Sequence, residues 1–102
     1  MNQSNTYGLT EKQFSELRNI FKDHNRISQV ILFGSRALGS NHKASDIDLC
    51  LKGENLSISD LSILGIKIDE LFLPYKYDLV IYDRINNQDL KDHIDRIGVA
   101  LL

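Results

Sequence analysis

The chain has 102 residues, of which 42% are hydrophobic and 25% charged, so one folded domain over residues 1–102 is expected and global disorder is not. Its 12 basic and 14 acidic side chains give a formal net charge of −2, which argues against the strongly basic face of a direct nucleic-acid binder. The single cysteine, the polar N-terminus and the absence of a long apolar run together predict a cytoplasmic protein that does not contact the membrane.

The first half of the chain shows two regular elements with clear signals. Residues 1–8 are expected to form a flexible tail, and Thr10 then begins a capping box, which predicts the start of an amphipathic helix. The β-branched and aromatic run at residues 30–33 predicts a buried strand that is bounded by Gly34. A turn or two of helix around Ala37 is expected before a polar loop.

The second half alternates strands with helices. Residues 46–51 alternate polar and apolar side chains with a period of two, which predicts a strand, and residues 77–82 predict another. Ser57 predicts the start of a helix, and Pro74 prevents this helix from continuing. A last helix is expected to end at Gly98. The resulting order, α-β-α-β-α-β-α, predicts an α/β protein with one small sheet, although the pattern alone leaves the pairing directions open.

Two carboxylates stand two residues apart on the strand at residues 46–51. Asp46 and Asp48 therefore leave the same face of the sheet and repel each other unless something positive lies between them. A hard divalent cation such as Mg²⁺ suits this arrangement, because it takes carboxylate, water and phosphate oxygens as ligands. The alternative is a solvated strand face that is simply acidic.

The turn before this strand favours an anion. Gly34 permits the close approach of a ligand to the backbone, and Ser35 adds a hydroxyl donor at a helix start. Arg36 is a candidate clamp for phosphate, although it can equally cover the helix surface. An ordinary tight turn is the alternative for this segment, and neither a P-loop nor a dinucleotide-binding fingerprint is present.

A third carboxylate, Asp78, begins the apolar run of the last predicted strand, where an acidic residue needs a partner or a function. The alternative interpretation is that Asp78 is simply an exposed carboxylate at the end of a strand. His93, by contrast, is expected to be a surface residue of the last helix.

Gly34-Ser35, ten intervening residues and then Asp46-Ile47-Asp48 resemble the motif of the DNA polymerase beta-like nucleotidyltransferase superfamily. The strings 32–37 and 45–49 are typical of its small prokaryotic members, the minimal nucleotidyltransferases, and residues 77–80 fit the strand of their third carboxylate. The resemblance covers most of residues 9–100. It implies the polymerase beta-like fold, with a small mixed β-sheet packed with helices.

The resemblance also implies roles for the candidate residues. Gly34 and Ser35 would hold the triphosphate of ATP, and Asp46 and Asp48 would ligate Mg²⁺, with two ions expected. Asp78 would complete the metal site on the acceptor side and help to activate the attacking hydroxyl. Small members of this family are commonly paired with helical HEPN-type toxins, which implies an antitoxin that transfers AMP to a tyrosine of such a partner, within a homodimer or a hetero-oligomer.

Two other functions remain open from the sequence. The same fold can act as a binding module that masks its partner without catalysis, or as a nucleotidyltransferase acting on small molecules. The apolar C-terminus, residues 98–102, either folds back over the core or contributes to an interface between chains.

Overall fold

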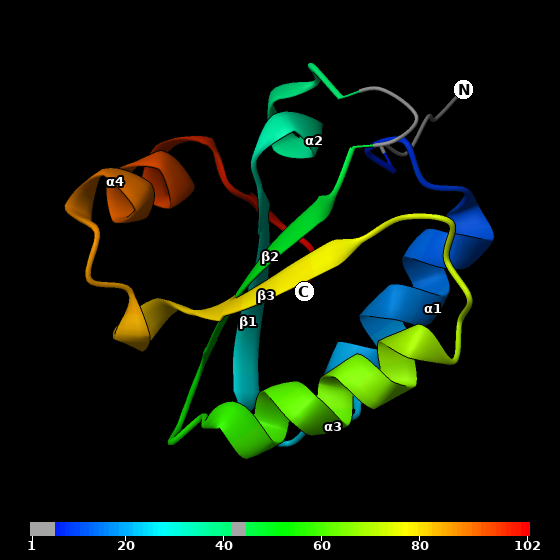
Figure 1. The fold of residues 1–102 in the computed structure, drawn as a ribbon, viewed down its shortest axis with the longest axis horizontal. Helices are drawn as coiled ribbons and strands as arrows, with labels where there is room; N and C mark the ends of the chain where they lie inside the picture. The colour runs from blue at the N-terminus through cyan, green and yellow to red at the C-terminus, as the bar shows by residue number, and fades with distance from the viewer. Residues whose placement is uncertain (1–5, 42–44) are drawn as a thin grey trace.

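A computed structural model describes residues 6–41 and 45–102 of the chain. The helices and strands follow one another in the predicted order, with a 3₁₀ turn and a short strand added in the C-terminal third (Figure 1). Their bounds are α1 Glu11–Lys22, β1 Ile27–Phe33, α2 Ser35–Leu38, β2 Ile47–Gly53, α3 Ile58–Asp69, β3 Tyr77–Ile81, η1 Tyr82–Arg84, α4 Gln88–Ile97 and β4 Val99–Ala100.

The four strands form one mixed sheet in the order β3-β2-β1-β4. Strand β1 runs antiparallel to both β2 and β4, whereas β2 and β3 are parallel. The expectation of a small mixed sheet packed with helices is thus confirmed. The pairing of β2 with β3 through the intervening helix α3 places the N-terminal ends of these two strands side by side (Figure 1).

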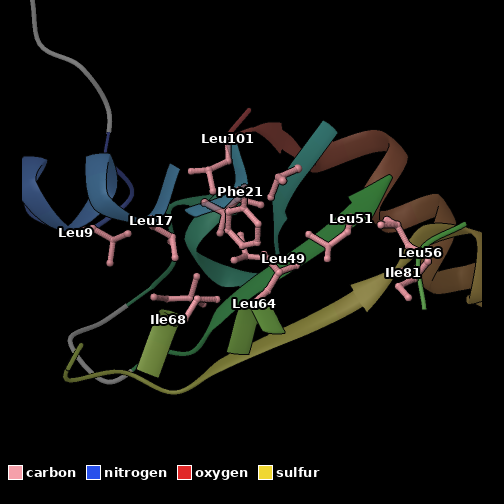
Figure 2. Close-up of a cluster of buried hydrophobic side chains, with 13 residues drawn as sticks. Leu9, Leu17, Phe21, Leu49, Leu51, Leu56, Leu64, Ile68, Ile81 and Leu101 are labelled. Atoms are coloured by element: carbon pink, nitrogen blue, oxygen red, sulfur yellow. The ribbon is translucent and has the colours of Figure 1, made fainter. Parts of the chain in front are cut away.

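The period-two alternation of the strands separates two hydrophobic clusters. One cluster packs α1 and α3 against one face of the sheet and contains Phe21, Leu49 and Leu64 among its buried members (Figure 2). The other contains Ile31, Phe33, Cys50 and Ile94, so that α4 covers the opposite face. Because residues two apart on a strand share a face, Asp48 emerges on the α4 side together with Cys50.

Capping contacts fix the starts of the helices as the sequence predicts. The Thr10 hydroxyl accepts from the Gln13 N–H at 3.0 Å, and the Gln13 side chain accepts from the Thr10 N–H at 2.9 Å. At α3, the buried Asp60 carboxylate accepts from the Ser57 N–H at 2.8 Å, and His24 and Arg26 also contact it. These hydrogen bonds lower the pKa of Asp60 to about 2, since they favour its charged form.

Both ends of the described chain contact the body of the domain. Of the expected tail, residues 6–8 are anchored: the Tyr7 carbonyl accepts from the Arg36 guanidinium at 2.8 Å, and the Tyr7 ring lies 6.2 Å from that of Phe14. Residues 1–5 lie outside the described part. At the C-terminus, Leu101 is 4% exposed and its N–H donates to the Val30 carbonyl at 2.8 Å, which supports folding back over the core. No helix within residues 6–41 and 45–102 is long and apolar enough to cross a membrane.

Candidate active site

The three aspartates predicted from the sequence meet at one end of the two parallel strands. Asp48 and Asp78 are direct partners in the register of β2 with β3, so their Cα atoms lie on strands about 4.8 Å apart. Asp46 comes immediately before β2, two residues from Asp48. Asp46 and Asp78 are exposed, whereas Asp48 is partly buried between them and the body of the protein.

The electrostatics of this group show that the carboxylates interact. The pKa of Asp48 is raised, first by burial and then by the negative charges of Asp78 and Asp46. Smaller opposing effects come from His93 and Arg36. A cation near Asp48 would relieve this repulsion, and hard carboxylate oxygens are the ligands that Mg²⁺ takes.

The three candidate aspartates do not by themselves enclose such an ion. Within the described residues, no group of three or more His, Cys, Asp or Glu side chains is arranged as a metal site. The carboxylates therefore fit an ion that keeps several water or phosphate oxygens, as Mg²⁺ usually does, better than one held by protein ligands alone.

The turn at Gly34 passes directly over Asp48. Gly34 has φ 78° and ψ −158°, in a region that is essentially accessible only to glycine. A Cβ at this position would also overlap the Asp48 Oδ2 atom. The close approach follows from the pairing of Phe33 with Asp48 across β1 and β2. The glycine is therefore required twice, by the backbone conformation and by the neighbouring carboxylate.

We expect Gly34→Ala to disrupt the site more than the fold. The positive φ would cost about 1–2 kcal/mol, and the added methyl group would push the Asp48 carboxylate away from its present place. The affinity for the nucleotide that the sequence predicts at this site should fall at least about tenfold, which corresponds to 1.4 kcal/mol. The measurement is nucleotide titration calorimetry together with a melting curve. Gly39→Ala is the matched control, because Gly39 also has a positive φ, 80°, but no atom of residues 6–41 or 45–102 lies within 4 Å of an added Cβ.

Arg36 has a buried guanidinium that binds main-chain carbonyls. The side chain is 2% exposed, and it donates to the Ser45 carbonyl from Nη2 at 2.8 Å and to the Asp46 carbonyl from Nε at 3.3 Å. Its guanidinium also lies 4.5 Å from the centre of the Tyr75 ring. These contacts tie the residue to the start of β2, where Asp46 is located. The predicted contact of Arg36 with phosphate stays a prediction, and the observed contacts indicate a supporting role.

His93 is half-buried at the site, so the prediction of a surface residue on the last helix is wrong. Its Nε2 atom accepts a hydrogen bond from the Gly34 N–H at 3.2 Å, and its ring meets that of Phe33 edge-on, 6.2 Å between centroids. A signal was present in the sequence: His93 stands three residues after Leu90 and four before Ile97, on the apolar face of the helix. The spacing predicts which face of the helix carries His93. It does not predict the hydrogen-bond partner, Gly34, which lies 59 residues away.

Solved structures with the same fold include several toxin–antitoxin complexes. A toxin–antitoxin structure with AMP-PNP shares 23% identity over 92% of this chain and 73% of that chain, with a TM-score of 0.69. An MntA-HpeT toxin–antitoxin mutant shares 19% identity over 87% and 71%, with a TM-score of 0.71. A tri-AMPylated Shewanella oneidensis HEPN toxin in complex with an MNT antitoxin shares 18% over 92% and 72%, with a TM-score of 0.68. At these identities the likeness shows a common fold.

The family assignment comes from the sequence itself. No curated protein matches the chain, but residues 15–102 match the model of the polymerase beta nucleotidyltransferase family. This match includes the Gly34 turn and all three aspartates of the candidate site. The chain therefore belongs to the polymerase beta nucleotidyltransferase family.

Proposed function

We propose that this protein transfers a nucleoside monophosphate, AMP from ATP, to a hydroxyl group of a partner protein. The observation that carries the proposal is the pairing of Asp48 with Asp78 beneath the Gly34 turn, in a chain of this family. Two carboxylates on adjacent strands, next to the turn at Gly34 and Ser35, suit a reaction in which phosphate oxygens must be held and their charge neutralised.

The residues would divide the work as follows. Ser35 would hold the triphosphate at the turn that Gly34 makes possible, and Asp46 and Asp48 would bind the Mg²⁺ that accompanies it. Asp78, exposed on the edge strand, faces the acceptor. Arg36 supports the site from within through the carbonyls of residues 45 and 46. Bound Mg²⁺ would supply charge neutralisation for the attacking and leaving oxygens, and two ions suit the three carboxylates.

The covalent change is a single substitution at phosphorus. The acceptor oxygen forms a bond to the α-phosphorus of ATP, and the bond from that phosphorus to the bridging oxygen of the leaving group breaks. Pyrophosphate leaves with the electron pair of this bond. The proton of the acceptor hydroxyl passes to Asp78 or, through it, to water. The protein forms no covalent intermediate, so positioning and charge account for catalysis.

A HEPN-type toxin is the partner that we propose, with a tyrosine as the acceptor and with this chain as the antitoxin. Two structures of the same fold support this partner: one was solved with AMP-PNP, and another was solved with a tri-AMPylated HEPN toxin. Exposed Asp78 on an edge strand leaves room for a side chain of another protein to approach.

The test combines binding with transfer. Because the carboxylates and the phosphate oxygens would share the metal, we expect tight ATP binding and transfer of label from α-labelled ATP to a HEPN-type partner only when Mg²⁺ is present. Titration calorimetry with Mg²⁺ or with EDTA measures the first, and gel autoradiography of the partner measures the second. Equal ATP affinity in both conditions would contradict the shared metal site. A partner that never acquires label would contradict the transferase.

A further inference from the structure

His93 connects helix α4 to the Gly34 turn. The helix packs on β1 through Ile94, which is buried with Ile31 and Phe33, and this packing brings the neighbouring imidazole to the end of β1. There the Nε2 atom accepts from the Gly34 N–H at 3.2 Å, and the ring lies at 82° to the ring of Phe33. Since Nε2 accepts, the proton of the neutral imidazole is on Nδ1.

This hydrogen bond restrains one of the two peptide planes that flank Gly34. The N–H of Gly34 belongs to the plane shared with Phe33, and His93 fixes its direction. The carbonyl of Gly34 belongs to the next plane, and it accepts from the Leu38 N–H at 3.1 Å. These two hydrogen bonds together restrain Gly34 to its φ of 78° and ψ of −158°, although glycine alone is free to adopt many other conformations.

The conformation held in this way is the one that the candidate site needs. At these angles the turn passes close over Asp48, whose Oδ2 occupies the place of the missing side chain of Gly34. If the turn relaxed to another glycine conformation, the relation between the Asp48 carboxylate and the phosphate-binding residues would change. His93 itself is half-buried, and it reaches the site through Gly34.

We propose that His93 is a positioning residue of the nucleotide site, which acts by holding the Gly34 N–H and so fixes the turn over Asp48. The inference rests on the proposed function, and it assigns the hydrogen-bond donors of the turn to different acceptors. The Gly34 N–H is engaged by His93, so the triphosphate is held by the N–H and hydroxyl of Ser35 rather than by the N–H of Gly34.

Two substitutions separate the hydrogen bond from the packing of the ring. His93→Phe keeps an aromatic ring against Phe33 but has no acceptor, whereas His93→Gln keeps an acceptor at similar reach without the ring. We expect His93→Phe to weaken the affinity for Mg-ATP about tenfold, the equivalent of one net hydrogen bond. His93→Gln should stay within about threefold of the wild type, a difference below 1 kcal/mol. Melting temperatures of both variants show whether they fold, and His93→Leu replaces His93→Phe if the latter does not.

A second readout needs no nucleotide. In the free protein, solvent exchange of the Gly34 amide proton, followed by NMR, should be about tenfold faster in His93→Phe and close to the wild type in His93→Gln. Wild-type exchange and wild-type affinity in His93→Phe would overturn the inference, as would equal impairment of both variants. If the wild type binds no ATP, the proposed function fails, while the amide exchange still tests the hydrogen bond of His93 separately.

Discussion

Replacing Asp46 and Asp48 together by asparagine is expected to lower nucleotidyl transfer by about 10³-fold or more. The two residues stand two apart at the start of β2, and Asp48 is also the register partner of Asp78. An amide is a much weaker ligand for a hard cation than a carboxylate, so the double change removes the negative charge that would hold Mg²⁺. Transfer of label from α-labelled ATP to the partner measures the effect.

The matched control removes the same charge elsewhere. Glu54 and Glu70 are exposed, at the end of β2 far from Asp48 and after α3 respectively, so Glu54→Gln with Glu70→Gln should leave transfer near the wild-type rate. Loss of transfer in this control would attribute the effect to net charge. Retained transfer in the double asparagine variant would reject the carboxylates as the metal site.

The same double variant should be more stable than the wild type when no metal is present. The pKa of Asp48 is raised in the folded state, which means that folding disfavours its charged form. Protonated Asp48 therefore favours the folded state. This contribution to stability is complete below the ordinary aspartate pKa of about 3.9, and it is lost as the pH rises through the raised pKa of Asp48. The variant should therefore melt at a higher temperature than the wild type at pH 7 in EDTA, and this advantage should shrink as the pH falls toward 4. A lower melting temperature at pH 7 would contradict the repulsion.

Local signals in the sequence predict the elements of this fold, because each depends on residues close together in the chain. The capping box at Thr10 and the stop at Gly98 are both found where the spacing places them. Strand β4 is missed because two residues, Val99 and Ala100, are too few to show a period. The direction of strand pairing is also absent from the pattern, since it depends on how the connections cross the sheet.

In the candidate site too, the residues that local patterns predict differ from those whose roles depend on distant partners. The face shared by Asp46 and Asp48 follows from the strand period, and the closeness of Asp78 follows once β2 and β3 are paired in parallel. Arg36 and His93 are different, because their roles depend on partners distant in sequence. The Arg36 guanidinium reaches the carbonyl of Tyr7, 29 residues away, and His93 reaches Gly34 through the packing of α4 on β1.

Asp78→Asn is expected to separate catalysis from binding. Asp78 is exposed on the edge strand β3, while Ser35, Asp46 and Asp48, which we propose to bind Mg-ATP, remain unchanged. If Asp78 orients or deprotonates the acceptor hydroxyl, transfer should fall by about 10²-fold or more. The affinity for Mg-ATP should change by less than about threefold, which is below 1 kcal/mol.

The comparison of transfer with neutralisation then decides between an enzyme and a masking module. Wild type and Asp78→Asn are assayed side by side at saturating partner, both for label on the partner and for inhibition of the toxin. Asp83→Asn is the control, since Asp83 is an exposed carboxylate just beyond the other end of β3 and its loss removes the same charge. We expect Asp78→Asn to form the complex but to lose both labelling and lasting neutralisation, because in the proposed function the modification and not the contact inactivates the toxin. Full neutralisation by Asp78→Asn, with no label on the partner in any sample, would reject the enzyme and establish a protein that acts by covering its partner.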